Sequence, residues 1–435
     1  MTEDLVVWGI GALLVAVTVI PAIVVRRRRE KEGAAASAEA RDYGLHEPVS
    51  LHPVIDPGLC IGSGGCVEAC PEGVLALISG QAVAVAPARC VGHGLCERVC
   101  PMHAIRLVFG TATRGIELPR IRENFETNVP GIFIIGELGG MGLVRNAFEQ
   151  GRQCVAGIAR TRDSRDDDVL DVVVVGCGPA GLSAALHLKK AGMRFVVLEK
   201  EPDVGGAVRH YPRRKLVMTH AFDIPGFGRL REREISKEQL ITIWSDVAQT
   251  AGLPIVTGAV VERIQRDGPR FIVQTQNERY LARRVILAIG RRGVARRLGV
   301  PGEERDNVYY GLAEPESFGG RRLVVVGGGD SAVEAALMLA EQPDTQVRLS
   351  YRKPTLQRVK PANLQRFNQA VRDGVVSPYW GSELCEIGGD HVTIAAADGT
   401  HTIRNDDVFV FIGGELPSQF LRETGIEMDT KFGTP

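Results

Sequence analysis

Uninterrupted apolar runs, rather than alternating or amphipathic ones, dominate the hydrophobic pattern of this 435-residue chain. The longest run extends from Leu5 to Val25, and Thr18 is its only residue with a polar side chain. Four short runs, each ending at a glycine or an acidic residue, occupy residues 172–175, 195–198, 285–289 and 323–326. Short apolar runs bounded by turn residues favour buried strands of a parallel sheet. The pattern therefore predicts an α/β fold preceded by a long apolar helix.

The long apolar run predicts a membrane anchor. At about 1.5 Å per residue, a helix over residues 5–25 can cross a hydrocarbon core of about 30 Å. Four arginines follow the run at 26–29, and positive charge favours the cytoplasmic side. A cleaved signal peptide, the alternative, carries its positive charge before the apolar run. We expect an anchor over residues 1–29, a linker over residues 30–50, and a single-pass location at the inner (cytoplasmic) membrane with the other domains facing the cytoplasm.

Composition narrows the functional class. The 52 basic and 52 acidic side chains cancel, so nucleic-acid binding has no support. The length allows roughly three domains. The 51 glycines are typical of a chain with many tight turns and nucleotide-binding loops.

A glycine-rich loop after the run at 172–175 predicts a dinucleotide site. Gly176 permits the turn, Gly178 lets a pyrophosphate approach the backbone, and Gly181 lets the next helix pack on the strand. That helix would open with Pro179 and Ala180, where free amides favour an anion. The following run ends at Glu199 and Lys200, and Glu199 stands where an acid binds ribose hydroxyls.

A second loop of this kind follows the run at 323–326. Its expected cofactor-binding residues are Gly327, Gly329, Asp330, Ser331 and, in place of a third glycine, Ala332. The next predicted strand ends in Arg352 and Lys353, with Arg358 nearby and no acid at the ribose position. Basic side chains there suit a 2′-phosphate, so we expect NADPH, with NADH as the alternative. A merely solvated basic face is the other interpretation of these three residues.

Two such loops resemble the thioredoxin-reductase-like flavoproteins, and most closely their ferredoxin–NADP reductase branch. The resemblance covers about residues 170–435 and includes Gly206 and the run that ends at Gly290. It implies FAD at the first loop, contacted by these two glycines, and NADPH at the second. Thioredoxin reductases carry a Cys-x-x-Cys pair before the second loop, whereas Gly311 and Glu314 occupy those places here. Without paired thiols the flavin needs another electron acceptor.

Six of the nine cysteines form two triplets, and each triplet ends in Cys-Pro. Thiolates on a tight glycine-rich loop can converge on an iron–sulfur cluster. The alternatives are weaker, because zinc sites space their cysteines more closely and disulfides are rare in the cytosol. The triplets are Cys60, Cys66 and Cys70, and Cys90, Cys96 and Cys100.

The triplets resemble the bacterial two-cluster ferredoxin repeat over residues 51–110. The cross-ligation of that repeat implies one cluster on Cys60, Cys66 and Cys100, and another on Cys70, Cys90 and Cys96. Ser63 and His93 replace one cysteine in each half, which leaves three thiolates per cluster. The clusters would be three-iron centres, or four-iron clusters with an oxygen or nitrogen ligand, for which His93 is the better candidate.

A segment that the flavoprotein family carries at its C-terminus occurs upstream in this chain. Residues 127–137 match its Thr-x-x-Pro-Gly-Ile-Phe-x-x-Gly-Asp pattern, with Glu137 in place of Asp. We therefore expect a circular permutation in which residues 111–160 complete the FAD domain, and Gly136 and Glu137 contact FAD. Termini that lie close together make such a rearrangement tolerable. The alternative is a truncated chain with an unrelated linker.

The expected architecture is α/β, with two Rossmann-like dinucleotide-binding domains, a small α+β ferredoxin-like domain and a transmembrane helix. After the anchor and the linker, the expected segments are the ferredoxin-like domain (51–110), the C-terminal part of the FAD domain (111–160), a linker (161–169), the FAD-binding domain (170–294), the NADPH-binding domain (295–405) and a return to the FAD domain (406–435).

These features together predict an oxidoreductase that passes electrons between NADPH and one-electron acceptors through FAD and two iron–sulfur clusters. The acceptor or donor would be a redox partner protein or a membrane electron carrier, and a homodimer is a further expectation from the family resemblance. The cofactors carry the chemistry, so no catalytic side chain is expected. Two alternatives remain: a thiol/disulfide reductase with ancillary clusters, and a non-enzymatic iron–sulfur redox sensor.

Overall fold

The computed structural model divides the chain into two compact units, which are described separately. Unit 1 comprises Met1–Ile116 and Lys431–Pro435, and unit 2 comprises Glu117–Thr430. The structure describes all residues except 1, 43–44, 49–50, 114, 141, 162–168, 212–215, 219–220, 233, 292–293, 313, 357–358, 397, 416 and 434–435.

Unit 1 contains two small antiparallel sheets and short helices around the cysteine loops. Strand β1 (Leu51–Ile55) pairs with β4 (Ile105–Phe109), and β2 (Leu75–Ile78) pairs with β3 (Gln81–Ala84). The short helices are α2 (Gly65–Ala69), η1 (Pro87–Arg89) and α3 (Leu95–Arg98). Gly64 and Gly94 precede α2 and α3 in the left-handed conformation, which favours glycine. Gly64 lies between Cys60 and Cys66, and Gly94 lies between Cys90 and Cys96, so each triplet contains one left-handed turn.

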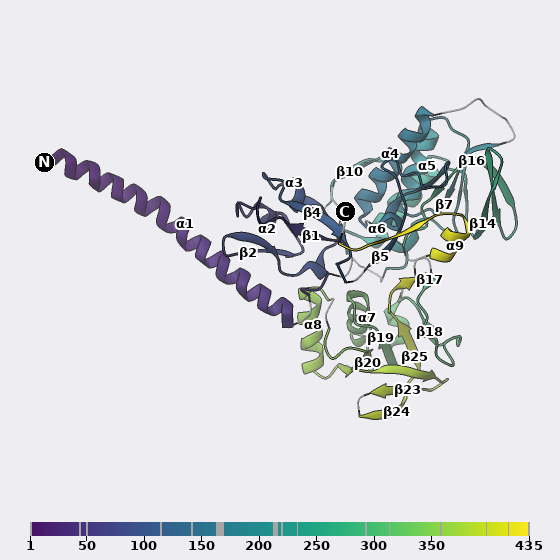
Figure 1. Ribbon diagram of the computed structural model, residues 1–435. Helices are drawn as coiled ribbons and strands as arrows, with labels where there is room; N and C mark the ends of the chain where they lie inside the picture. Colours follow the sequence, from purple (N-terminus) through teal and green to yellow (C-terminus); the bar gives the residue numbers. More distant parts are fainter. Residues whose placement is uncertain are drawn as a thin grey trace. The chain divides into compact units, whose positions relative to one another are not determined.

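The N-terminal helix α1 (Thr2–Asp42) extends well beyond the predicted 21-residue anchor and includes part of the expected linker (Figure 1). Its second half packs on β2, where a Cβ at Gly33 would meet the Leu77 carbonyl oxygen at 2.4 Å. Arg29 pairs with Glu68 of α2 at 2.7 Å. Small apolar side chains of the helix end and the following turn join a buried cluster with the β2–β3 region.

The predicted membrane anchor is contradicted. Within the residues that the structure describes, no helix is long and apolar enough to cross a membrane. The predicted single-pass location at the inner membrane is corrected on the same finding. Helix α1 as a whole is not apolar, because it continues from residue 25 through four arginines into a second half rich in charged residues.

Unit 2 contains a first sheet in the strand order β13–β8–β7–β16–β15–β14, with β6 (Ile132–Ile134) also paired to β16. The pairs from β13 to β16 and the β6–β16 pair are parallel, whereas β14, β15 and β16 are antiparallel neighbours. The strands are β7 (Leu170–Val175), β8 (Phe195–Leu198), β13 (Ile255–Val256), β14 (Val261–Asp267), β15 (Arg270–Thr275) and β16 (Arg279–Leu287).

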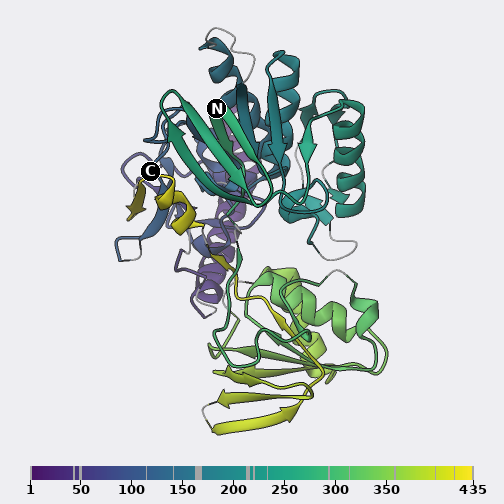
Figure 2. The ribbon, with the colours of Figure 1, turned by 90° about the vertical axis from the view of Figure 1, so that its right-hand side faces the viewer.

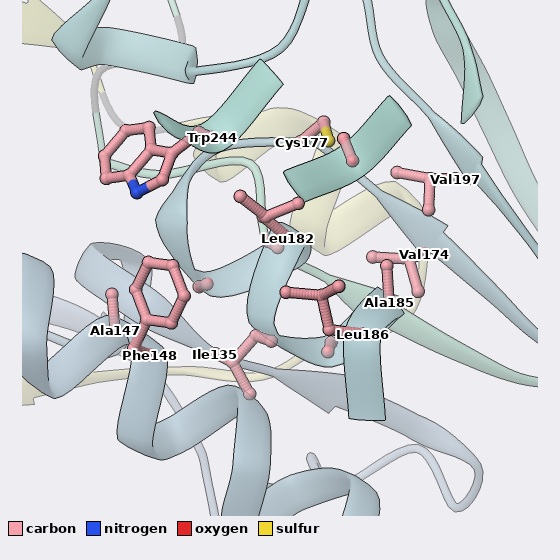
Figure 3. Packing of buried hydrophobic residues seen from close by; sticks show 14 of the residues in the cluster. Ile135, Ala147, Phe148, Val174, Cys177, Leu182, Ala185, Leu186, Val197 and Trp244 are labelled. Carbon is pink, nitrogen blue, oxygen red and sulfur yellow. The ribbon is translucent and has the colours of Figure 1, made fainter. Parts of the chain in front are cut away.

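Helices α4 (Val144–Arg160), α5 (Pro179–Lys190) and α6 (Lys237–Thr250) contribute to the core beside this sheet. Figure 3 shows Phe148 of α4 beside Leu182 of α5 and Trp244 of α6, and the Phe148 and Trp244 ring centroids lie 6.1 Å apart. The Ser183 hydroxyl donates to the Phe148 carbonyl oxygen at 2.6 Å. A Cβ at Gly151 would lie 2.7 Å from the Ala180 carbonyl oxygen, so α4 and α5 are in close contact.

A second sheet of unit 2 is wholly parallel, with the order β18–β25–β19–β20–β21. Its strands are β18 (Val308–Tyr309), β19 (Arg322–Val326), β20 (Gln346–Tyr351), β21 (Val376–Trp380) and β25 (Asp407–Val410). Helices α7 (Asp330–Ala340) and α8 (Pro361–Arg372) pack on it. A smaller antiparallel sheet of β22 (Glu383–Ile387), β23 (His391–Ala396) and β24 (Gly399–Arg404) is drawn in yellow-green in Figure 2. The predicted α/β fold with Rossmann-type sheets is confirmed.

Short two-stranded pairs complete unit 2. These pairs are β9 (Leu216–Met218) with β12 (Glu234–Ser236), β10 (Phe222–Ile224) with β11 (Gly228–Leu230), and β17 (Val294–Ala295) with β26 (Gly414–Glu415).

The first and last segments of unit 2 lie side by side. Strand β5 (Ile116–Pro119) pairs with β27 (Met428–Lys431). Arg120 Nη2 lies 2.7 Å from Asp429 Oδ1, and the same guanidinium contacts Glu427. The Asn128 side chain donates to the Gly425 carbonyl oxygen at 2.9 Å and accepts from the Glu427 amide at 2.9 Å. We call these contacts the terminal clasp, which is completed by an ion pair between Glu117 and Arg422 of α9 (Ser418–Glu423).

Candidate functional site

A cavity of about 1190 Å³ in unit 2 is bounded by both glycine-rich loops. This exceeds the usual volume of a small-molecule site, about 300–1,000 Å³. Two expected cofactor residues, Gly181 and Ala332, do not line it, and Arg358 lies outside the described residues. The expected residues on its wall are Gly136, Glu137, Gly176, Gly178, Pro179, Ala180, Glu199, Lys200, Gly206, Gly290, Gly327, Gly329, Asp330, Ser331, Arg352 and Lys353.

The first loop brings bare backbone to the cavity wall. Gly176 has φ +98°, and a Cβ at Gly181 would lie 1.9 Å from the Gly176 carbonyl oxygen. A Cβ at Gly206 would lie 2.9 Å from the Gly178 Cα, so these two backbones also approach closely. Gly178 caps α5 and Pro179 opens it, which leaves the first amides of the helix without intrahelical partners. The loop thus fits a pyrophosphate bound to backbone amides.

Glu199 is a buried carboxylate at the end of β8, with only 3% of its surface exposed. One of its oxygens accepts from the Cys177 amide at 2.5 Å, and the other accepts from the Glu201 amide at 3.0 Å. Each carboxylate oxygen retains acceptor capacity beyond one bond. The carboxylate is therefore fixed by backbone and can still receive hydroxyl donors, as a ribose requires.

The upstream segment contributes to the same cavity. The Gly136 amide donates to the Gln150 side chain at 2.7 Å, and its φ is +81°. A Cβ there would lie 3.0 Å from the Ala180 Cβ. Gly136 and Glu137 therefore lie against the helix that follows the first loop, although some 40 residues of sequence separate them from it.

The second loop lies at the N-terminus of α7. A Cβ at Gly327 would lie 2.5 Å from the Phe411 carbonyl oxygen, and one at Gly328 would lie 2.3 Å from the Tyr351 ring. The Asp330 carboxylate accepts from the Lys360 amide at 2.9 Å and from the Asn363 side chain at 3.0 Å, which fixes the start of α8. Arg352 and Lys353 follow β20 and reach the cavity wall, so the two basic residues that could bind a 2′-phosphate lie beside the loop.

Sequence analysis missed a polar group in which Arg297 and Tyr310 line this cavity and the buried Glu303 contacts Tyr310. The Tyr310 hydroxyl donates to Glu303 at 2.6 Å, and Glu303 also accepts from the Leu298 and Gly299 amides at 2.5 and 2.7 Å. The Arg297 guanidinium carbon lies 5.5 Å from the Tyr310 ring centroid. No motif marks Arg297 and Glu303, which lie between β17 and β18, or Tyr310, which directly follows β18.

Tyr310→Phe should destabilise unit 2 by about 1–2 kcal/mol, because a buried carboxylate loses a donor. Burial alone would raise the pKa of Glu303, but the Tyr310 hydroxyl and the two amides outweigh burial and lower it. A lowered folded-state pKa adds stability above the unfolded value of about 4.3 that is lost as the pH falls through the folded pKa. Denaturant unfolding from pH 7 to pH 3 should show a smaller loss of stability on acidification in the variant, because the folded-state pKa of Glu303 then lies closer to the unfolded value. Equal profiles for both proteins would contradict the assignment.

The six triplet cysteines form two groups in unit 1. Burial and the nearby thiols of Cys60 and Cys100 raise the pKa of Cys66. Burial and the nearby thiols of Cys70, Cys90 and, least of the three, Cys66 raise the pKa of Cys96, to about 11. Cys60, Cys66 and Cys100 also line one cavity. Each group thus combines two cysteines of one triplet with the last cysteine of the other.

The donor set of these groups fits iron–sulfur clusters. The Ala82 amide donates to Cys60 Sγ at 3.4 Å and the Ala104 amide donates to Cys100 Sγ at 3.3 Å, the kind of bond that stabilises cluster sulfur. All nine cysteines are free thiols. Among the described residues, no group of three or more His, Cys, Asp or Glu side chains could hold a single metal ion.

The three remaining cysteines do not replace the missing Cys-x-x-Cys pair. Burial raises the pKa of Cys177 to about 12, and burial also raises that of Cys154. Reactive cysteines need an exposed, electropositive setting. Cys385 is exposed on β22.

Comparison with known proteins identifies both parts of the chain. The family model described as pyridine nucleotide-disulphide oxidoreductase matches residues 173–435. The chain belongs to this family. A family model for a 4Fe-4S dicluster domain matches residues 52–101 of this chain. The resemblance to two-dinucleotide flavoproteins and to two-cluster ferredoxins is confirmed, and the protein is an FAD-dependent oxidoreductase with an iron–sulfur domain.

Individual members of the pyridine nucleotide-disulphide oxidoreductase family agree with this assignment. A ferredoxin–NADP reductase of Ignicoccus hospitalis is 31% identical over 60% of this chain and 83% of its own. A thioredoxin reductase of Listeria monocytogenes is 30% identical over 57% of this chain and 75% of its own. The solved bacillithiol disulfide reductase of Staphylococcus aureus is 26% identical, with a TM-score of 0.54 over 60% of this chain and 81% of its own.

Proposed function

We propose that this protein passes electrons between NADPH and a one-electron redox partner protein through FAD and two iron–sulfur clusters. The observation that carries the proposal is the single cavity in unit 2 that both glycine-rich loops line. A shared cavity lets the chain hold two dinucleotides with their reactive ends in one enclosure. When bound, FAD supplies the conversion between hydride and single-electron transfer.

The residues of unit 2 would divide the binding between the two loops. Amides at the start of α5 would bind the FAD pyrophosphate, and Glu199 would accept from its ribose. Amides at the start of α7 would bind the pyrophosphate of NADPH. Gly311 and Glu314 stand in place of a thiol pair, and Cys154 and Cys177 are buried, so none of these four positions offers a thiol route out of the cavity. The six thiols of unit 1 provide the other redox group.

Replacing both Arg352 and Lys353 with alanine should weaken NADPH binding about 100–10,000-fold, because two charge-assisted hydrogen bonds of about 1.5–3 kcal/mol each are lost. NADH binding should change less than threefold, since NADH has no 2′-phosphate. Isothermal titration of the FAD-loaded protein with NADP⁺ and NAD⁺ measures both values. Equal losses for the two dinucleotides would show that the pair does not contact the 2′-phosphate.

We also propose that residues 111–160 complete the FAD domain as a circular permutation. Four contacts support this proposal: β6 in the first sheet, α4 against α5, Gly136 on the cavity wall, and the terminal clasp. A stray linker has no reason to supply a strand paired with β16 and a core helix. Close termini are what a permutation requires.

A chain rebuilt in the order 170–430 followed by 117–160 tests the permutation. We expect it to fold as a single cooperative unit and to retain FAD, because the clasp, β6 and α4 keep their neighbours. Visible absorbance of bound flavin and a thermal melt are the measurements. A matched chain that ends at residue 430 and lacks 117–160 should not retain flavin. Equal flavin retention in both chains would contradict the proposal.

Anaerobic addition of NADPH to the full chain tests the electron path. Bleaching of flavin absorbance, followed by a low-temperature EPR signal from reduced clusters, is the expected result. Bleaching without a cluster signal would show that unit 1 does not accept electrons from unit 2. Stoichiometric reduction of the dithiol reagent DTNB, with no dependence on the clusters, would instead favour a thiol reductase.

A further inference from the structure

The strand order of the second sheet in unit 2 separates the two ends of a bound dinucleotide. On one side β19 pairs with β20, which is followed by Arg352 and Lys353. On the other side β19 pairs with β25, and β25 pairs with β18. Nucleotides bind across the carboxyl ends of parallel strands, at the point where the connections diverge. With the 2′-phosphate beside β20, the nicotinamide half of NADPH would extend from the second loop toward β25 and β18.

Tyr310 stands at that far side of the cavity. It directly follows β18, and the strand register brings it level with Val410 of β25 and Val326 of β19. Since neighbouring strands lie about 4.8 Å apart, its backbone is about 10 Å from the residue that precedes the second loop. Tyr310 and Arg297 both line the cavity. The half of a dinucleotide that lies beyond its pyrophosphate would therefore meet these two side chains.

Arg297 is an exposed cation whose orientation is set by more buried groups. Its guanidinium carbon lies 5.5 Å from the Tyr310 ring centroid, within the range of a cation–π contact. The Tyr310 hydroxyl donates to Glu303 at 2.6 Å, and only 5% of the surface of Glu303 is exposed. A guanidinium held over a ring by its face keeps N–H donors at its edge, and that edge can bind a phosphate through two parallel bonds.

The wall beside Arg297 also has room for a flat ring. Gly311 follows Tyr310 in the chain, and the Arg296 amide donates to the Gly413 carbonyl oxygen at 2.9 Å. Both glycines line the cavity, and apart from their chain neighbours no described residue comes within 4 Å of a Cβ built on either. A basic side chain beside bare backbone suits a phosphate that is joined through a ribose to a planar base.

We propose that Arg297 and Tyr310 form the subsite for the nicotinamide nucleotide half of NADPH. Arg297 donates to the phosphate attached to the nicotinamide ribose. Tyr310 is a positioning residue, because its ring supports the guanidinium while Glu303 fixes its hydroxyl. The inference rests on the proposed use of NADPH, and it adds two residues that belong neither to the glycine-rich loops nor to the basic pair after β20.

Isothermal titration of the full-length, FAD-loaded protein with NADP⁺, NAD⁺ and adenosine 2′,5′-bisphosphate tests the subsite. Arg297→Ala should weaken the binding of both dinucleotides about 10–100-fold, which corresponds to one charge-assisted hydrogen bond. The bisphosphate lacks the nicotinamide half, so its affinity should stay within about twofold. Arg297→Lys keeps the charge but loses the planar fork, and it should recover part of the affinity for NADP⁺.

Two further changes separate positioning from folding. Tyr310→Leu removes the supporting ring and should weaken NADP⁺ more than Tyr310→Phe, which retains the ring, while both variants bind the bisphosphate as the wild type does. Arg372→Ala removes an exposed arginine from α8, outside the cavity, and should change none of the three affinities. A purely structural role of Tyr310 would lower all three affinities together.

Several outcomes would overturn the proposal. Unchanged NADP⁺ affinity in Arg297→Ala would show that the guanidinium does not contact the ligand. An equal loss for NADP⁺ and the bisphosphate would place Arg297 at the adenosine half. Equal NADP⁺ affinities in Tyr310→Leu and the wild type would refute the positioning role. Failure of the proposed function gives a different result, because the wild type itself would then bind neither dinucleotide.

Discussion

Gly181→Val should yield a protein that retains no FAD. A Cβ at this position would lie 1.9 Å from the Gly176 carbonyl oxygen, and the extra methyl groups of valine would be forced against the same strand. Overpacking of this kind costs about 1–3 kcal/mol in stability. The larger effect falls on binding, because the helix that presents the pyrophosphate amides must move away from Gly176. Flavin absorbance of the purified protein and its denaturant midpoint measure both effects.

Gly157→Ala is the matched control for that variant. Gly157 lies inside α4, and nothing approaches within 4 Å of the Cβ it would gain. Alanine in a helix interior is more stable than glycine by about 0.5–1 kcal/mol, so the control should keep its FAD and melt slightly higher. If Gly181→Val keeps its flavin as this control does, the close contact of helix and strand is not what forms the site.

Cys70→Ser should remove the cluster of the second triplet rather than that of the first. Cys70 belongs to the first triplet in sequence, but its thiol lies with Cys90 and Cys96. Losing one of three thiolates should abolish that cluster, while the group of Cys60, Cys66 and Cys100 keeps all its ligands. Iron analysis and EPR should therefore show loss of about half of the iron and of one of two signals.

Two further variants test whether Cys70 binds the cluster of the second triplet. Cys100→Ser should remove the other signal, because its thiol lies with the first triplet. Cys385→Ser should change neither signal, since that thiol is on the surface of unit 2. Loss of the same signal in Cys70→Ser and in a Cys60→Ser variant would show that each triplet binds its own cluster.

Much of the fold could be predicted because it depends on backbone constraints that specify residue types. Gly176 and Gly181 are required by the contact of strand, turn and helix, so the strands, the turn and α5 could all be identified from sequence. Residues 127–137, for which we propose the permutation, include Gly136, whose left-handed φ beside Ala180 requires a residue type in the same way. The predicted anchor failed because an apolar run does not define where a helix ends, and α1 continues to Asp42.

The site was less predictable wherever it depends on tertiary contacts alone. Arg297, Glu303 and Tyr310 meet only because β18 returns beside the segment after β17, and no local pattern reports such a meeting. Asp330 lines the cavity, and its hydrogen bonds to Lys360 and Asn363 at the start of α8 were not predicted from sequence. The prediction that each cluster takes the last cysteine of the other triplet came from a family resemblance. Spacing within a triplet could not provide it, because that spacing is the same if each triplet binds its own cluster.

The two units are joined by the chain at two places, near residue 116 and near residue 431. Unit 2 is thus inserted in sequence between the two segments of unit 1. The second segment contacts the first through a hydrogen bond from the Gly433 amide to the Phe109 carbonyl oxygen. In the proposed function a donor and an acceptor are on one chain, so dilution does not lower their effective concentration. Electron exchange between the units should therefore be first order in protein, and a single proteolytic cut at either connection would leave the other covalent connection intact.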